Sequence, residues 1–239
     1  MLGSSVAGLQ RLMNKLNEVA EEFGMSINIK KTKIMRISKS DARKFEIKVN
    51  GQCLEQVSQF KYLGSTITED GRCQKEVRIR IATAKEAFNK RKCLLSRKMN
   101  RQLKKRIIKS LIWSVALYGA ETWTLAKGDI SRLEAFEMWI WRRMEKISWT
   151  EHVSNKAVFK QIDDKRSLIT VIQQRQKNWM GHVLRRDGLL KNLLEGRLEG
   201  KKPRGRPRKK MLDRLGMVIM KRRAEDRISW KCWEPETCQ

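Results

Sequence analysis

The chain has 239 residues, of which 40% are apolar and 33% are charged, so it is long enough to bury one or two hydrophobic cores. Its 54 Lys and Arg residues exceed its 26 Asp and Glu residues by a formal charge of +28, which points to nucleic acid as partner, ahead of a membrane surface or an acidic protein. With no run near the roughly 20 apolar residues of a membrane span, no secretory signal and five scattered Cys, we expect a soluble intracellular protein with reduced thiols.

The first seventy residues begin with a helical pattern and continue with strand patterns. Apolar residues recur at helical spacing over residues 5–23, and Gly24 follows as a left-handed cap, so an amphipathic helix is predicted there. Residues 26–37 alternate apolar and polar side chains and predict a half-buried strand. The side chains expected to pack this strand on the helix are Ile27, Ile34 and Ile37.

Two further strand patterns follow. Residues 44–57 predict a hairpin, because apolar and charged side chains alternate on its first arm and Asn50 and Gly51 are the pair that a type I′ turn favours. Residues 60–67 predict another strand, interrupted by Gly64 where a bulge or a close backbone approach needs no side chain. Together these strands predict a small antiparallel sheet.

A strongly basic helical hairpin is predicted over residues 74–118, since apolar residues recur at helical spacing along both arms. These residues are Val77, Ile81, Ala84, Phe88 and Leu95, then Leu103, Ile107, Leu111 and Val115. Between Lys85 and Lys109 there are eleven Lys or Arg residues and one Glu, which favours salt-sensitive phosphate contacts over the alternative of a solvated bundle face. The residues expected to bind nucleic acid are Lys90, Arg91, Lys92, Arg97, Lys98, Arg101, Lys104, Lys105 and Arg106.

Six tryptophans between residues 113 and 179 could stack on single-stranded nucleic acid, but core packing is the interpretation that the pattern favours. Trp139 and Trp141 cannot face the same way on one helix, so one is expected in the core and the other half-exposed. His152 and His182 stand without Cys or carboxylates at metal spacing, so no metal-binding residue is expected.

The composition changes after a further predicted helix over residues 167–186. Residues 197–210 hold eight basic residues, one acidic residue and two of the three prolines, which is typical of a flexible basic linker. Within it, residues 203–209 look like an AT-hook, whose extended core lies in the minor groove of A·T-rich DNA; a non-specific linker is the alternative. The basic residues expected to contact DNA here are Arg204, Arg206, Arg208 and Lys209.

Five short motifs spread along almost the whole chain resemble one protein family. They are Gly24-x-x-x-Asn28-x-x-Lys31-Thr32, Phe60-Lys61-Tyr62-Leu63-Gly64-Ser65, Leu117-Tyr118-Gly119-Ala120-Glu121-Thr122-Trp123, Trp179-x-Gly181-His182-Val183-x-Arg185-Arg186 and Gly205-Arg206-Pro207-Arg208. In this order they are similar to the end of the palm domain and the C-terminal region of LINE-type (non-LTR) retrotransposon reverse transcriptases.

The resemblance implies an α+β fold that is mostly α, with a small antiparallel sheet (a truncated palm), a basic thumb-like helical bundle and a helical tail. The corresponding regions are residues 1–70 for the palm remnant, 71–127 for the thumb-like region, 128–195 for the helical C-terminal region and 196–239 for the basic linker and terminal helix. By the same resemblance, Lys31 lies near the triphosphate of the incoming nucleotide, and Tyr62, Leu63 and Gly64 lie near the primer end.

The family's catalytic carboxylates lie in an earlier strand and in a Tyr-Ala-Asp-Asp-like box, and the match to this chain begins after that box. We therefore expect a fragment of an RNA-directed DNA polymerase that binds RNA, DNA or hybrid duplex, with no catalytic residue and no cofactor of its own, although intact family members use Mg²⁺. An active enzyme would need converging carboxylates, and the acids at residues 69–70 and 163–164 lie in turns or helix starts. The alternative is a host-adopted, chromatin-associated DNA- or RNA-binding protein, and the nucleus is the expected location.

Overall fold

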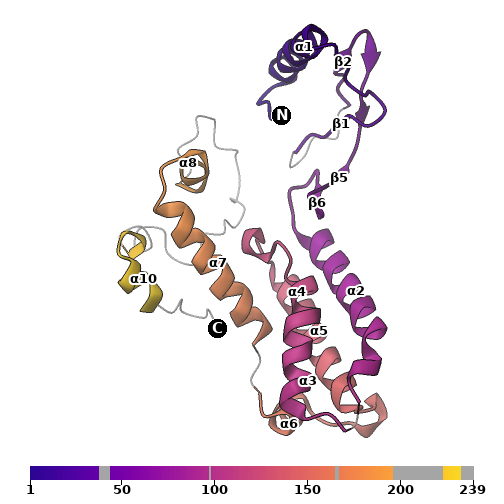
Figure 1. Cartoon of the computed structure of the whole chain (residues 1–239), viewed down its shortest axis with the longest axis vertical. Coiled ribbons are helices and arrows are strands. Elements are labelled where there is room, and N and C mark those ends of the chain that lie inside the picture. The colour runs from indigo at the N-terminus through magenta and orange to yellow at the C-terminus, as the bar shows by residue number, and fades with distance from the viewer. Residues whose placement is uncertain (38–43, 97, 165–166, 196–222, 233–239) are drawn as a thin grey trace. The chain divides into compact units, whose positions relative to one another are not determined.

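The computed structural model describes residues 1–37, 44–96, 98–164, 167–195 and 223–232. The chain divides into two compact units, unit 1 (residues 1–76) and unit 2 (residues 77–239). All strands of the described residues belong to unit 1, whereas the described part of unit 2 is helical (Figure 1). The predicted fold class, α+β and mostly helical, is confirmed.

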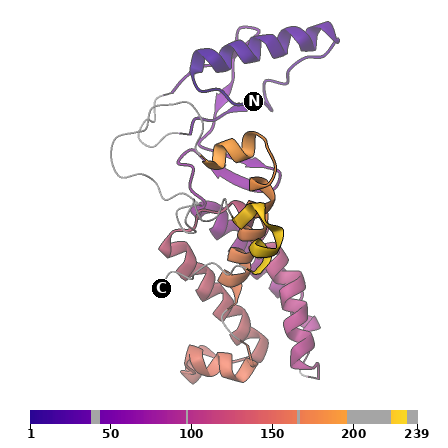
Figure 2. The same cartoon turned by 90° about the vertical axis from the view of Figure 1, so that its left-hand side faces the viewer.

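Unit 1 begins with the predicted helix. α1, Val6–Glu22, is capped by the Ser5 hydroxyl, which accepts a hydrogen bond from an amide of the first turn, and Gly24 follows with the predicted left-handed φ of 68°. In both views α1 lies beside the strand β2 (Figure 1, Figure 2). The Gln10 side chain joins them, because it donates to the Lys48 carbonyl at 2.7 Å and accepts from the Lys48 amide at 2.8 Å.

The hairpin predicted over residues 44–57 is confirmed around its turn, with shorter arms than predicted, because residues 55–56 pair with β1. β2, Lys48–Val49, pairs antiparallel with β3, Gln52–Cys53. Asn50 and Gly51 between them adopt φ angles of 49° and 78°, the left-handed values that a type I′ turn requires. The turn therefore sets the register of the hairpin from sequence alone.

The first predicted strand joins this region by a parallel pairing. β1, Lys33–Ile34, runs parallel to β4, Glu55–Gln56. One antiparallel sheet was predicted, whereas the described residues form three two-stranded sheets, of which this one is parallel and the other two are antiparallel. A parallel pair needs a long connection, and the chain that includes the β2–β3 hairpin supplies it.

The core of unit 1 contains side chains from α1 and from the strands that follow. It is formed by Met13, Ile34, Ile47, Val49 and Leu54. Ile27 packs against this cluster, as predicted, whereas Ile37 is 60% exposed. The prediction for Ile37 was wrong: β1 ends at Ile34, and even in a longer strand residue 37 would face the side opposite to the buried Ile34.

Residues 59–68 form a second hairpin where a single strand was predicted. β5, Gln59–Tyr62, pairs antiparallel with β6, Ser65–Thr68. Leu63 and Gly64 form the turn, with φ angles of 47° and 81°. Gly64 is thus a turn residue and does not create a bulge; it adopts a left-handed conformation without steric cost.

Unit 2 consists of short and medium helices, and α2 begins at the end of unit 1, so the division falls within its first turn. The α-helices of this part are α2 (Gln74–Lys90), α3 (Arg101–Ile107), α4 (Trp113–Ala116), α5 (Lys127–Glu145), α6 (Asn155–Ile162), α7 (Leu168–Leu184), α8 (Leu189–Glu195) and α10 (Arg227–Cys232). The 3-10 helices are η1 (Lys92–Leu94), η3 (Ala120–Thr122) and η4 (Trp149–Glu151), and η2 (Ile108–Ile112) is a π-helical segment. The helix predicted over residues 167–186 is confirmed as α7.

The two arms of the predicted helical hairpin differ in outcome. The first arm buries Val77, Ala84 and Phe88, as predicted, but in the second arm Leu103 and Leu111 are exposed. The buried residues of the second arm are Lys105, Ile108, Ile112, Trp113, Ala116 and Leu117. The prediction chose the wrong face of this arm because apolar residues occupy two faces and a periodicity count treats Lys as polar. In addition, the π-helical segment changes the register between α3 and α4.

The core of unit 2 is built around α5. Trp141 is fully buried and its ring lies edge-on to Trp113, at 6.0 Å between centroids and 62° between planes, whereas Trp139 is half-buried. The expectation that one of the two neighbouring tryptophans is core and the other partly exposed is therefore confirmed. The buried Glu137 carboxylate fixes the start of α7, because it accepts from the Leu168 amide at 3.1 Å.

The last described helix, α10, packs on α7. Trp230 is buried in a cluster with Met180, Leu184 and Ala224. Gly181 gives it room, because a Cβ atom at this position would lie 2.2 Å from the indole nitrogen of Trp230. The buried Lys177 ammonium donates to the Lys231 carbonyl at 3.3 Å and adds a polar attachment.

Candidate nucleic-acid interface

The basic residues predicted to bind nucleic acid lie on both sides of the turn between α2 and α3. Lys90 is the last residue of α2, and Lys92 begins the short helix η1 that follows. Asn100 caps α3, since its side chain accepts from the Gln102 amide at 2.8 Å. Arg97 lies outside the described residues. The described members of the predicted set thus lie on this connection or at the helix ends beside it, and they have different roles.

Two of these cations interact with their own helix. Lys90 forms an ion pair with Glu86 at 2.9 Å, one turn earlier. The hydrogen bond and charge of Lys90 lower the pKa of the Glu86 carboxyl, so the pair is charged at neutral pH. Arg91 donates to the Ala87 carbonyl at 3.3 Å and caps the end of α2. Each of these two side chains would have to give up its contact before it could bind a ligand.

Lys105 requires a correction, because its side chain points into the protein. It is 7% exposed, and its ammonium donates to the Ile162 carbonyl at 3.1 Å and the Asp163 carbonyl at 2.9 Å, with the Asp164 carboxylate at 3.8 Å. A cation buried among three oxygen atoms holds the end of α6 against α3. Lys105 is therefore a structural residue and is not available to a phosphate.

The acidic residues near this turn are used for similar attachments. Glu145 binds Arg101 at 3.1 Å and joins the end of α5 to the start of α3. Asp164 also binds Lys109 at 2.9 Å, so one carboxylate serves two cations. The acids thus neutralise those cations that fasten the helices together.

Four cations of the turn remain on the surface. Within the described part of the chain no ion pair involves them, and they are Lys92, Lys98, Lys104 and Arg106, here called the basic turn surface. Lys104 is half-buried and the other three are exposed. Positive charge without an ion-pair partner among the described residues is what phosphate contacts require.

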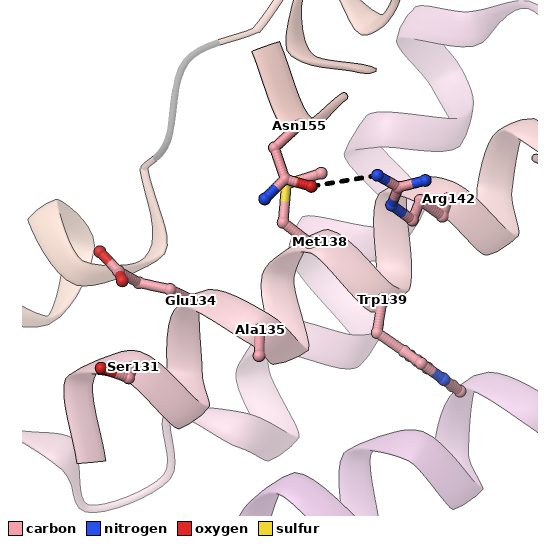
Figure 3. Close-up of a pocket in the computed structure, with 7 residues that line it drawn as sticks. All are labelled: Ser131, Glu134, Ala135, Met138, Trp139, Arg142 and Asn155. Carbon is pink, nitrogen blue, oxygen red and sulfur yellow. Dashed lines mark hydrogen bonds between the residues drawn. The ribbon is translucent and has the colours of Figure 1, made fainter. Parts of the chain in front are cut away.

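Two open pockets border the half-buried Trp139, and neither was predicted from the sequence. The first, of about 480 Å³, is bordered by α5 and the start of α6, where Arg142 donates to the Asn155 side chain at 3.1 Å (Figure 3). Figure 3 shows the Trp139 ring pointing away from Asn155. The second, of about 550 Å³, lies between α2 and α5, and its residues are Arg78, Ile81, Ala82, Lys85, Arg132, Ala135, Phe136 and Trp139.

The residues assigned to the palm by resemblance lie in unit 1. Lys31 is exposed in a turn, where its backbone amide donates to the Asn28 side chain at 3.1 Å. Tyr62 and Leu63 are 57% and 75% exposed at the tip of the β5–β6 hairpin, and Gly64 completes the turn. Their proximity to a nucleotide or a primer end stays a prediction.

Two of the family-like motifs have structural roles in unit 2. In residues 117–123, Gly119 has a left-handed φ of 71° that turns the chain, and the Gln176 amide donates to the carbonyls of Ala120 and Trp123 at 3.0 and 2.8 Å. In residues 179–186, Gly181 gives room to Trp230. The turn at residue 119 and the packing at residue 181 thus give both motif glycines a structural role.

Several predicted features lie outside the described residues or give no site within them. The AT-hook-like residues Arg204, Arg206, Arg208 and Lys209 fall in the segment 196–222, which the structure does not describe. Among the described residues, no cluster of three or more His, Cys, Asp or Glu could hold a metal ion. None of the described helices has the length and apolar character needed to cross a bilayer.

The chain is similar to a transposon-derived protein. Over 186 residues it is 28% identical to a Caenorhabditis elegans protein that is named as transposon-derived, and the match covers 74% of this chain and 64% of that protein. The chain thus spans less than two thirds of its relative's length. No protein-family model and no solved structure matches the chain. The similarity indicates a transposon-related protein.

Proposed function

We propose that this chain is the C-terminal part of a LINE-type reverse transcriptase, that it binds nucleic acid by the phosphate backbone through the basic turn surface, and that it has no polymerase activity by itself. The motif resemblance and the transposon-derived relative support the first part. The observation that carries the second part is that Lys92, Lys98, Lys104 and Arg106 stay outside the ion pairs of the described residues.

The distribution of acids explains why this surface favours a polyanion. Glu145 and Asp164 are carboxylates that contact α3 or its continuation, and both bind cations that connect helices. A formal charge of +28 raises the self-repulsion of the folded chain, and phosphates relieve it. Since Lys and Arg contacts to phosphate do not read bases, the binding is independent of sequence and depends steeply on salt.

Two of the four acids considered for polymerase chemistry, Asp70 and Asp164, have other partners. Asp164 is bound by Lys105 and Lys109, and Asp70 accepts from the Thr68 hydroxyl at 2.5 Å and from the Arg72 amide at 3.0 Å. Two-metal phosphoryl transfer needs carboxylates that converge on both ions. We therefore expect no template-dependent primer extension by the purified chain with Mg²⁺ or Mn²⁺, and incorporation above a buffer control would contradict the proposal.

The test of binding is a salt titration with a charge-reversed variant. The variant K104E/R106E should bind a DNA duplex or an RNA–DNA hybrid more weakly, and the slope of log Kd against log salt should fall by about 0.9 for each phosphate that the variant no longer neutralises. The matched control is R11E/K15E, which makes the same change of charge on exposed residues of α1. Fluorescence anisotropy over a series of salt concentrations measures the affinity and the salt slope of each variant.

Each outcome of this titration decides something different. A lower slope for K104E/R106E alone supports the basic turn surface as the binding site. Equal reductions of the slope in both variants would show that net charge, and not this surface, governs binding. An unchanged slope in both variants would mean that these cations are solvated and do not contact phosphates. A strong preference for A·T-rich over G·C-rich duplex would instead favour the host-adopted protein that uses the AT-hook-like segment.

A further inference from the structure

The pocket between α2 and α5 has an apolar floor and a cationic rim, a combination that phosphate binding alone does not require. Its volume of about 550 Å³ lies within the roughly 300–1,000 Å³ of small-molecule sites, and it is open to solvent. We propose that it holds one unpaired nucleobase of a single-stranded nucleic acid, with the flanking phosphates on its rim. The inference rests on the proposed function, because it concerns the same polyanionic partner.

The floor is aromatic. The rings of Phe136 and Trp139 are nearly parallel, with an interplanar angle of 16° and 6.3 Å between centroids, and Phe88 supports Trp139 edge-on at 5.3 Å. Phe136 is buried, whereas Trp139 is half-exposed, so the indole is the ring that a ligand can reach. Bases of any sequence stack on such a ring because every base has a π-face.

The rim supplies the charge that a nucleotide needs beside its base. The Lys85 ammonium lies 5.2 Å from the centroid of the Trp139 ring, and Arg78 borders the same pocket from the preceding turns of α2. A lysine side chain is long and flexible, so a base that stacks on Trp139 can replace the ammonium, which then reaches a phosphate. Arg132 is less available, since Asp129 binds it at 3.1 Å.

Small side chains keep the pocket open. Ala82 on α2 and Ala135 on α5 are both exposed and border it, so neither helix fills the space between them. A paired base is stacked inside its duplex and cannot enter, and an unpaired base can. The pocket therefore distinguishes single-stranded from double-stranded partners, which the basic turn surface does not do.

The decisive probe is a strand that has phosphates and no bases. Fluorescence anisotropy compares an oligothymidylate of about 12 nucleotides, an oligouridylate of the same length and an abasic strand of the same length. The variant Ala82→Leu fills the pocket from an exposed position without changing charge, and Ala157→Leu makes the same substitution on an exposed position of α6. Circular dichroism checks that both variants keep their helices.

We expect Ala82→Leu to weaken binding of the base-bearing strands by about fivefold to a hundredfold, while binding of the abasic strand and of a duplex stays within about a factor of two. Trp139→Phe keeps an aromatic ring against Phe88, so it should reduce the affinity for base-bearing strands by a smaller factor. An equal reduction for thymidylate and uridylate assigns the contact to the base ring that they share. A reduction for one of them alone assigns part of the contact to the thymine methyl group or to the sugar, the two groups by which these strands differ.

The outcomes separate the pocket from the proposed function. If the native chain binds abasic and base-bearing strands equally, or if Ala82→Leu behaves like Ala157→Leu, the pocket holds no base, and backbone binding by the basic turn surface still stands. If the native chain binds none of the strands and no duplex, the proposed function fails as well.

Discussion

Unit 1 and unit 2 use their apolar and charged residues in different ways. The core of unit 1 contains five buried residues, and α1 and its cap leave a row of apolar side chains 40–72% exposed, namely Leu12, Leu16, Val19 and Phe23. Unit 2 buries whole aromatic rings such as Trp141 and also buries the cations Lys105 and Lys177. Only a deep core offers the carbonyls and carboxylates that a buried ammonium needs.

The sign of a residue's charge therefore does not decide its role in this chain. In unit 2 Glu145 and Asp164 bind cations that fasten helices, and no ion pair of the described residues involves the basic turn surface. In unit 1 Lys33 and Glu55 form an ion pair between β1 and β4, and most other charges lie on the surface. Substitutions in the two units can test this difference, beginning with the one of largest expected effect.

Lys105 should be the most sensitive cation of the described chain. Lys105→Ala leaves the carbonyls of Ile162 and Asp163 and the carboxylate of Asp164 without their buried partner, so we expect the free energy of unfolding to fall by about 3 to 5 kcal/mol. Urea unfolding monitored by tryptophan fluorescence measures it. The control is Lys104→Ala on the same helix, which should change the free energy of unfolding much less. Similar small changes for the two variants would show that Lys105 is a surface cation.

In unit 1 an apolar residue should matter more than a cation. Ile34→Ala removes part of a five-residue core and should cost roughly 2 to 4 kcal/mol, whereas Lys31→Ala should stay within about 0.5 kcal/mol because its side chain is exposed. Thermal or urea unfolding of the two variants is the measurement. Equal small effects would mean that unit 1 is not folded in solution, and a large effect for Lys31→Ala would reveal a structural partner.

Gly181→Ala should release α10 from α7. The new Cβ atom would meet the rigid Trp230 ring at 2.2 Å, and we expect a cost of about 1 to 3 kcal/mol together with faster proteolysis near Trp230. Gly128→Ala is the matched control, since its Cβ atom would lie at an ordinary 3.5 Å from Arg132 in a helix and should stabilise slightly. Unchanged protease sensitivity in Gly181→Ala would contradict the close packing.

The smallest effect concerns Glu86, whose carboxylate competes with phosphate for Lys90. Because its pKa is lowered, the carboxylate is charged at neutral pH, and the ion pair disappears only when the pH falls through that lowered pKa. Glu86→Gln should therefore raise duplex affinity at neutral pH by about twofold or less, most clearly at low salt. Weaker binding by this variant would show that Glu86 positions Lys90 for the ligand.

Local chemistry made part of the fold predictable. Asn50 and Gly51 determine a type I′ turn, and Gly24 determines the end of α1, because few residues adopt left-handed conformations without strain. The turn at Leu63 and Gly64 was missed, since Leu rarely occupies a left-handed position and only the glycine signalled anything unusual. Such a turn depends on strand pairing that a local pattern does not contain.

The candidate site was predictable as a charge cluster and not as a geometry. The surplus of cations between Lys85 and Lys109 is visible in sequence, but the burial of Lys105 depends on carbonyls at Ile162 and Asp163, which lie 57 and 58 positions away. The same holds for the pocket at Trp139, which forms only when α2 and α5 meet. Contacts between distant segments decide which charges remain available.

The packing of α8 and α10 on α7 also has a consequence for the attachment of α10. Leu194 packs against the cluster on α7 that contains Ala224, although residues 196–222 separate the two in the chain. A cut in the chain between these two residues would therefore leave α10 joined to α7 by packing alone.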